Sequence, residues 1–276
     1  RMCHVMRVAR SCYYEWLNRP LSKQQEEDLV LGEEIKKSFK ESRCTYGHRR
    51  IKKELRGKGF KTSNDRVRRL MKELNLVPVQ ARKFKATTNS KHSLPVAPNL
   101  LKKNFKADEP CQKYVGDITY IHTDDGWLYL AAVIDLFSRK VVGWALGERM
   151  TKQLVINAMN QAINHEKPAE GLIFHSDRGS QYASYDYQGL LRKHGYRQSM
   201  SAKGDCYDNA CAESFFATIK KECIRLERFK TRSEARLKIV DYIVWYNAKR
   251  RHSYLGNISP LEFEKQYYQN ILGEAA

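Results

Sequence analysis

The sequence predicts an α/β protein in which a mixed β-sheet is flanked by helices and preceded by an all-α region with a helix-turn-helix. Two observations lead to this prediction. Apolar residues recur at helical spacing within the first 78 residues, whereas from Gln112 onward β-type runs come first and then alternate with helical ones. This order is typical of one sheet covered by helices. With 276 residues, the chain is long enough for two globular units.

Three helices are expected in the N-terminal part of the chain. They cover residues 22–42, 48–56 and 63–77. Ser22 is the candidate N-cap of the first helix. Ser63 or Asn64 caps the third helix, and Pro78 ends it. A short glycine-rich break joins the second and third helices, which predicts a helix-turn-helix over about residues 43–78. A small helical bundle with a basic solvent-exposed surface is the alternative.

The charge of the chain favours a polyanionic partner. Its net charge is +19 and its pI is near 9.6. Most of the excess lies in the first 110 residues, which contain 27 Lys or Arg against 12 Asp or Glu. Residues 42–106 contain 19 basic residues and three acids. Double-stranded DNA is the leading candidate partner, because many phosphate contacts need such an excess. A basic surface that only keeps the protein in solution is the alternative.

The predicted helix-turn-helix supplies the candidate DNA-contacting residues. In such a unit the second helix enters the major groove, and phosphate contacts are more secure than base readout. The candidates on that helix are Asn64, Arg66, Arg68, Arg69 and Lys72, and those on the preceding helix are Arg49 and Arg50. Residues 83–110 carry three prolines and show no periodicity, so they are expected to form a basic linker that could follow DNA.

Strands and helices are then expected in a definite order. The predicted strands cover residues 112–122, 127–137, 140–148, 171–177 and 197–201, and the predicted helices cover 152–166, 185–196, 209–225, 231–250 and 254–267, with a loop at 204–208. The chain is thereby divided into a helical region at 1–82 that is expected to bind DNA, the linker at 83–110, a core with the mixed sheet at 111–226 and a C-terminal helical extension at 227–276.

Three carboxylates form a candidate metal site. Asp117 lies in the middle of an apolar strand, where an uncompensated carboxylate would be costly to bury. Asp177 ends an apolar strand, and Glu213 lies on a predicted helix. Mg²⁺ prefers oxygen ligands, and three convergent carboxylates can hold two ions that cleave a phosphodiester. Lys220, seven residues after Glu213, falls about 20° from the same helical face and is expected to point at the same DNA.

Other acids and one histidine compete for a place in this site. Asp135 is the chief rival, although it could instead pair with Arg139. Asp124 and Asp125 fit a hairpin turn. Asp208 is a candidate cap for the helix that carries Glu213, and Asp205 lies in the same loop. A supporting hydrogen-bonding role is expected for His175.

Six stretches share motifs with a known protein family. They are YGHRRI, GDITYI, VIDLFSRKVVGW, HSDRGSQY, SMSAKGDCYDNACAESFFATIKKE and YNAKRRHSYLGNISPLEF, from roughly residue 43 to 265. In these stretches the chain resembles bacterial insertion-sequence transposases of the retroviral-integrase-like DDE group, of the insertion sequence three type. The resemblance implies an RNase H-like fold, a catalytic triad of Asp117, Asp177 and Glu213, and contact of Lys220 with the element's DNA end. Tyr114 departs from the family pattern, which has Trp, but this changes no metal ligand.

The resemblance also implies an activity and its partners. Such a transposase hydrolyses a strand at the ends of its element to free a 3′-hydroxyl, which then attacks a second phosphodiester. Two Mg²⁺ ions, for which Mn²⁺ substitutes, are implied. So are terminal-repeat and target DNA, a homo-oligomer on DNA and an upstream-frame protein of the same element. We expect the helix around Ile239–Tyr246 to form either an oligomer interface or part of the core. The alternative functions are an RNase H-like nuclease without strand transfer and a catalytically silent DNA-binding regulator.

The cysteines and the apolar runs indicate the compartment. The seven cysteines form no C-x-x-C pair, and their odd number argues against a complete disulfide framework. Ordinary packing thiols in a reducing cytoplasm are expected, without a signal peptide and without a membrane partner. The longest apolar run, LYLAAVI at 128–134, is too short to cross a bilayer.

Overall fold

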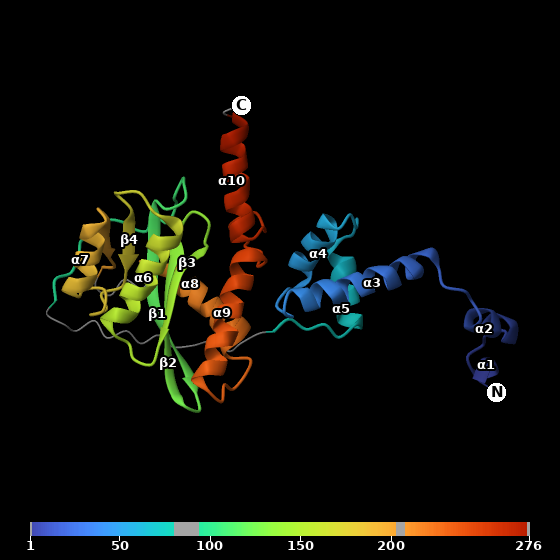
Figure 1. Ribbon diagram of the computed structural model, residues 1–276. Coiled ribbons are helices and arrows are strands. Elements are labelled where there is room, and N and C mark those ends of the chain that lie inside the picture. The colour runs from blue at the N-terminus through green and yellow to red at the C-terminus, as the bar shows by residue number, and fades with distance from the viewer. Residues whose placement is uncertain (1, 80–93, 203–207, 275–276) are drawn as a thin grey trace. The chain divides into compact units, whose positions relative to one another are not determined.

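A computed structural model describes residues 2–79, 94–202 and 208–274 (Figure 1). The chain divides into two compact units, Arg1–Pro78 and Val79–Ala276. Part of the predicted linker at 83–110 and most of the predicted loop at 204–208 lie outside the described residues, together with Asp205. No helix among the described residues is long and apolar enough to span a bilayer.

The first unit is helical, as predicted. Its helices are α1 (Met2–Val5), α2 (Arg10–Leu17), α3 (Lys23–Glu41), α4 (His48–Gly57) and α5 (Asn64–Glu73). Ser22 caps α3 in a reciprocal capping box with Gln25, and the Ser63 hydroxyl accepts from the Arg66 amide at the start of α5. The last three helices enclose one apolar core. It consists of Leu31, Ile35, Phe39, Tyr46, Ile51, Leu55, Val67, Leu70 and Met71.

The second unit is built on a five-stranded mixed sheet with the order β3-β2-β1-β4-β5. The strands are β1 (Lys113–Thr123), β2 (Gly126–Asp135), β3 (Val141–Gly147), β4 (Ile173–Ser176) and β5 (Arg197–Met200). The first three form an antiparallel meander, whereas β4 runs parallel to β1 and β5 runs parallel to β4. The prediction of a mixed sheet is therefore confirmed.

Helices cover both faces of this sheet (Figure 1). They are α6 (Lys152–Glu166), α7 (Tyr185–Lys193), α8 (Ala210–Ile219) and α9 (Arg232–Ala248), whereas α10 (Pro260–Glu274) packs against α9 and extends beyond the sheet. Because neighbouring residues of a strand point to opposite faces, β1 contributes to two separate cores. Tyr114 packs with α6 and α7, and Val115 and Ile121 pack with α8 and α9.

Gly143 on β3 allows α6 to pack closely against the sheet. A Cβ at this position would lie 2.2 Å from the backbone oxygen of Ala158 and 2.9 Å from the Cβ of Ala162. Any side chain would therefore have to displace helix backbone. The small residues on both sides fix the spacing of this layer.

The C-terminal helices differ from the prediction in two ways. One helix was predicted over 209–225, but α8 ends at Ile219 and a π-helical turn, η1 (Lys220–Ile224), follows. In addition, Ile239, Tyr242 and Tyr246 on α9 are buried in the core that contains Val115. The core alternative for this helix is therefore correct, and its aromatic face is not available as an oligomer interface.

Candidate active site

The parallel register of β1 and β4 aligns two of the predicted carboxylates. The pairing of these strands ends at Val115 and His175. Two residues after these partners lie Asp117, within β1, and Asp177, which directly follows the last residue of β4, so the parallel pairing brings both carboxylates to the same end of the two strands. Neighbouring strands are about 4.8 Å apart. Both side chains are partly accessible.

Glu213 comes to the same face of the sheet on α8. Ala212 and Phe215 of this helix are buried in the core that contains Val115, which is two residues before Asp117 on the same face of β1. Glu213 lies in the first turn of α8, and its side chain is exposed. The packing of α8 on β1 thus brings the third carboxylate to the side of the sheet where Asp117 lies.

The electrostatics of Asp117 indicate that the three acids are close to one another. Burial raises the pKa of Asp117, and the charges of Asp177 and Glu213 raise it further. The Ile118 amide and the Lys220 ammonium oppose this rise without cancelling it. Burial also raises the pKa of Glu213. The cluster therefore disfavours simultaneous ionisation of all three acids, as expected when like charges share one site.

The backbone fixes two of these carboxylates. One oxygen of Asp117, Oδ1, accepts from the Ile118 amide at 2.7 Å. Oδ1 of Asp177 accepts from the Gly179 amide at 2.9 Å. A Cβ on Gly179 would lie 3.0 Å from that same Asp177 oxygen, so the glycine leaves room for it.

The donor chemistry of this cluster fits Mg²⁺. All three candidate ligands are carboxylates, the oxygen donors that a hard cation prefers. A partly buried acid whose negative neighbours raise its pKa is a position where a divalent cation would relieve the repulsion. Across the described part of the chain, no three His, Cys, Asp or Glu side chains are close enough to hold a metal as they stand. The three acids are thus near one another but are not closed into a coordination shell.

Two residues before α8 connect that helix to the sheet. Asn209 Nδ2 donates to the Gly116 carbonyl at 3.3 Å. Oδ2 of Asp208 accepts from the Ala202 amide at 2.7 Å and from Asn99 Nδ2 at 2.9 Å. Asp208 therefore does not cap α8, contrary to the prediction, because Ala202, just after β5, and Asn99 already donate to its carboxylate. The N-cap of α8 is Asn209, which makes no side-chain cap bond.

His175 lies beneath the site as a supporting residue, in the role expected from the sequence. It is fully buried on β4, with Nδ1 2.8 Å from the Ser199 hydroxyl and Nε2 3.3 Å from the Ser201 hydroxyl. Burial lowers its pKa to about 4. A neutral imidazole held by Ser199 of β5 and by Ser201, just after that strand, links β4 to the end of β5 just before Asp177.

Lys220 begins the π-helical turn rather than continuing α8 as predicted. Its Nζ lies 5.3 Å from the centre of the Tyr120 ring. Burial lowers the pKa of Lys220, an effect that Arg225 reinforces and Asp117 opposes. The ammonium thus lies within electrostatic range of the carboxylate cluster.

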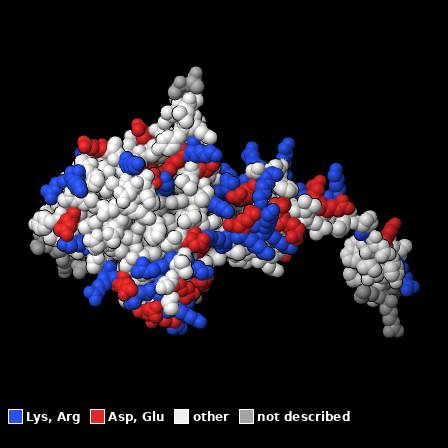
Figure 2. Space-filling model, in the orientation of Figure 1, with Lys and Arg blue, Asp and Glu red and all other residues white. Residues whose placement is uncertain are grey.

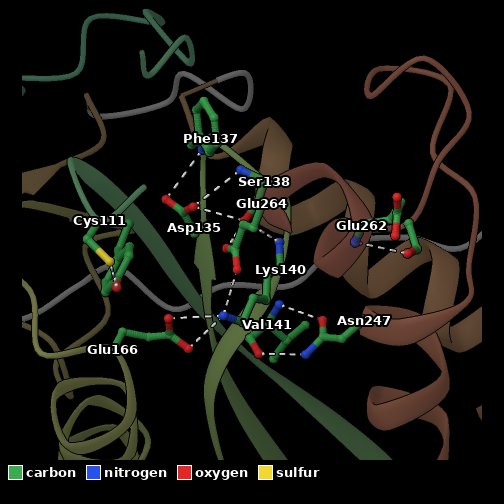
Figure 3. A network of polar contacts seen from close by, with 12 residues as sticks. Cys111, Asp135, Phe137, Ser138, Lys140, Val141, Glu166, Asn247, Glu262 and Glu264 are labelled. Atoms are coloured by element: carbon green, nitrogen blue, oxygen red, sulfur yellow. Dashed lines mark hydrogen bonds and ion pairs between the residues drawn. The ribbon is translucent and has the colours of Figure 1, made fainter. Parts of the chain in front are cut away.

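The chief rival, Asp135, belongs to a different network (Figure 3). Its carboxylate accepts from the amides of Phe137 and Ser138 and from the Ser138 hydroxyl, at 2.9–3.3 Å. It does not pair with Arg139, which donates to Cys211 and to the Phe105 carbonyl. Burial raises the pKa of Asp135 to about 6.

A lysine sits at the centre of that network. Lys140 Nζ lies 2.8 Å from Glu166 on α6 and 2.8 Å from Glu264 on α10. The Ser138 hydroxyl bridges Asp135 and Glu264 (Figure 3). Lys140 thus pairs with two of the three acids and Ser138 links the third to Glu264, so the network joins α6 and α10 to the β2–β3 turn.

The predicted DNA-contacting arginines of α5 fall into two groups. Arg66 Nε donates to Asp28 Oδ1 at 2.6 Å, and Arg69 donates to Asp28 Oδ2 and to Glu73. Both side chains are therefore engaged by acids, including Asp28 of α3. Over α3–α5, Figure 2 shows red acidic atoms among the blue basic ones.

Four of the five remaining candidates lie at exposed positions. Arg49, Asn64, Arg68 and Lys72 are exposed. Arg50 is half-buried, with its guanidinium 5.3 Å from the centre of the Tyr46 ring. The exposed residues of α5 are consequently the ones best placed for phosphate.

Three residues beside the site were missed in the sequence. They are Asn209, Glu222 and Arg250. Glu222 follows the core residue Ile219 by three positions, so helical periodicity alone places this charge on the buried face. A charged residue on a buried face indicates that an oppositely charged or hydrogen-bonding partner lies in the core.

Family models match both units of the chain. An HTH-like domain matches residues 25–84, and models of the integrase core domain match residues 107–206 and 194–260. Among solved structures, the HTLV-2 integrase catalytic core domain in complex with magnesium is 17% identical. It covers 58% of this chain and 99% of that one, with a TM-score of 0.45.

Two bacterial relatives match almost the whole chain. The insertion element IS600 uncharacterized 31 kDa protein of Shigella sonnei is 49% identical, over 97% of this chain and 99% of that protein. Transposase InsF for insertion sequence IS3A of Escherichia coli (strain K12) is 45% identical, over 96% of this chain and 93% of that protein. The chain therefore belongs to the IS3 transposase family, with an HTH-like domain followed by an integrase core.

Proposed function

We propose that this transposase cleaves and joins DNA strands at the ends of its insertion sequence with Asp117, Asp177 and Glu213. The observation that supports the proposal is the parallel pairing of β1 with β4, which ends two residues before each aspartate, together with the packing of α8 on β1. The three carboxylates would hold two Mg²⁺ ions, with Mn²⁺ as a substitute. When bound, such ions activate the attacking oxygen and stabilise the leaving one.

The chain's own residues would orient the DNA. Lys220, near Asp117, would bind a phosphate of the element end. Exposed residues of the HTH-like domain, Arg49, Asn64, Arg68 and Lys72, would bind terminal-repeat DNA, mainly through phosphates. Arg50, Arg66 and Arg69 are weaker candidates because ring or acid contacts engage them.

The proposed organisation keeps four segments. Residues 1–82 would bind DNA, 83–110 would act as a basic linker, 111–226 would form the catalytic core and 227–276 a helical extension whose helix α9 packs on the sheet. The working form would be a homo-oligomer on DNA in the bacterial cytoplasm, able to act with an upstream-frame protein of the same element.

Strand cleavage and joining on end-containing DNA test the proposal. Separate changes of Asp117, Asp177 and Glu213 to Ala should abolish Mg²⁺- or Mn²⁺-dependent cleavage and leave DNA binding in place. Asp135→Ala serves as the matched control and should retain cleavage in its folded fraction. Unchanged cleavage in any triad variant would refute that residue's role. Nicks without joined strands from the wild type would instead indicate a nuclease.

A further inference from the structure

A buried ion pair lies directly beyond the proposed active site. Arg250 Nε and Nη2 each donate to one carboxylate oxygen of Glu222 at 2.7 Å. The Tyr242 hydroxyl donates to the same carboxylate at 2.8 Å. The side chains of Glu222 and Arg250 are only 6% and 7% exposed. Three donors thus satisfy one carboxylate inside the C-terminal core.

Stability alone is a poor explanation for such a pair. Two charges lose their hydration on burial, and well-packed apolar residues of similar volume are often equally or more stabilising. What a forked pair adds is geometry, because two parallel bonds fix the orientation of both side chains. The question is which part of the molecule needs that orientation.

Glu222 lies in the turn that begins with Lys220. In η1 the Arg225 amide bonds to the Lys220 carbonyl at 3.0 Å, five residues back. Reversion to α-helical pairing would bond that carbonyl to the amide of Ile224 instead. Wide turns of this type are uncommon and occur often at functional sites. Glu222 is the third of the five residues of this turn.

Arg250 provides a rigid anchor for this contact. Its amide donates to the Trp245 carbonyl at 3.1 Å, and its guanidinium lies 5.6 Å from the centre of the Tyr246 ring. Both aromatic residues belong to α9 and are buried in the core beneath the sheet. The pair therefore ties the turn to the buried core of the unit.

We propose that the Glu222–Arg250 pair is a positioning device that holds the π-helical turn and thereby sets the Lys220 ammonium beside Tyr120 and the carboxylate cluster. Glu222 and Arg250 touch neither DNA nor metal in this account; they act through Lys220. The inference rests on the proposed function, in which Lys220 binds a DNA phosphate.

A double-mutant cycle between Glu222→Gln and Lys220→Ala tests this coupling. The first readout is binding of end-containing DNA without divalent metal, measured by anisotropy at several salt concentrations. Lys220→Ala should lower the slope of log K against log salt by about one, the value for one lost phosphate contact. Glu222→Gln should produce the same loss when Lys220 is present and almost none when it is absent.

The second readout is the single-turnover cleavage rate at saturating DNA with Mg²⁺. Glu222→Gln should slow cleavage by about 100-fold, the size expected from misplacing one group by about 1 Å. In the Lys220→Ala background the same change should cost less than about threefold. Equal costs in the two backgrounds would overturn the inference, as would an unaltered salt slope in Lys220→Ala.

A nearby exposed pair provides the control. Glu227 accepts from Lys238 at 3.2 Å, and both side chains are about half exposed. Glu227→Gln should leave the salt slope and the cleavage rate unchanged. A loss equal to that of Glu222→Gln would show a general effect of removing an acid and would overturn the inference.

Two further variants keep the test valid if Glu222→Gln fails to fold. Tyr242→Phe removes one donor and leaves the ion pair, whereas Arg250→Lys keeps the charge and loses the fork. Each should show the same dependence on Lys220 with a smaller effect, and additivity in both would contradict the proposal. The binding cycle needs no catalysis. Failure of the triad variants to block cleavage would therefore refute the proposed active site separately.

Discussion

Two clusters of three carboxylates lie in the same unit, and different groups contact the carboxylates of each cluster. Asp135, Glu166 and Glu264 surround Lys140, and the Ser138 hydroxyl bridges two of them. In the other cluster, the Asp117 and Asp177 carboxylates each accept from a backbone amide. Burial raises the pKa of Asp117, and the charges of Asp177 and Glu213 raise it further. The first cluster is organised around a lysine that joins two helices to the β2–β3 turn, whereas the acids of the second raise the pKa of Asp117, which suits a site that binds a cation from solution.

Removing one charge from each cluster tests most directly whether the first cluster serves stability and the second serves cleavage. Asp177→Asn should slow cleavage by at least about 100-fold, since mutation of residues that only support metal ligands can already reduce metal affinity or activity by about that much. Its free energy of unfolding should be unchanged or higher, because repulsion with Asp117 is relieved. Glu264→Gln should lower the free energy of unfolding and keep the cleavage rate per folded molecule. Single-turnover kinetics and urea denaturation measure both, and the reverse pattern would refute the distinction.

Removing the Lys140 ammonium should cause the largest loss of stability. Lys140→Met leaves Glu166 and Glu264 mostly buried without their common partner and should lower the free energy of unfolding by about 3–5 kcal/mol. Lys152 pairs with Asp186 at the surface, so Lys152→Met is the matched control, with an expected cost below about 1 kcal/mol. Equal urea midpoints for the two variants would contradict the assignment.

The pH dependence of stability should distinguish Asp135 from an ordinary surface acid. Burial raises its pKa from 3.8 to about 6, so between these values the native state keeps a proton that the unfolded state loses. The contribution of Asp135 to stability is therefore complete below pH 4 and is lost as the pH rises to 6, by roughly 2–3 kcal/mol. Asp135→Asn should remove this fall. Urea titrations at pH 4, 5 and 6 provide the check, and identical slopes for wild type and variant would exclude it.

The same distinction between engaged and open charges should hold in the HTH-like domain, with the smallest effect. Arg68→Ala should reduce the salt slope of DNA binding by about one and leave the unfolding midpoint nearly unchanged. Arg66→Ala, which removes the partner of Asp28, should lower the unfolding midpoint and keep the slope. Anisotropy titrations and thermal unfolding separate these outcomes, and a reduced slope in Arg66→Ala would show that this arginine binds DNA.

The sequence was sufficient for the architecture and for the identity of the candidate acids. Helical periodicity and caps located α3, α4 and α5, and the change to β-type runs located the meander. It could not supply contacts between distant residues. Asp208 was expected to cap a helix because local pattern favours that role, but Asn99, more than 100 residues away, occupies its carboxylate. The widened turn after α8 depends on Arg250, which local propensity cannot reveal.

The proximity of the aspartates illustrates the same limit. Their strands could be predicted, but not that Val115 pairs with His175, because register is set by packing across the whole sheet. Asp135 could be excluded from the site only once its link through Ser138 to Glu264, a partner of Lys140, was known.

The register of β1 and β4 also makes the proposed active site sensitive to the parity of the chain. Inserting one residue within β4 would shift Asp177 by one position relative to Asp117 and rotate the end of the strand. One residue inserted in the loop before Ile173 would leave the pairing of Val115 with His175 unchanged. Insertions of equal size a few residues apart should therefore have opposite consequences. The proximity of Asp117 and Asp177 therefore depends on the number of residues in each strand as much as on the chemistry of the two side chains.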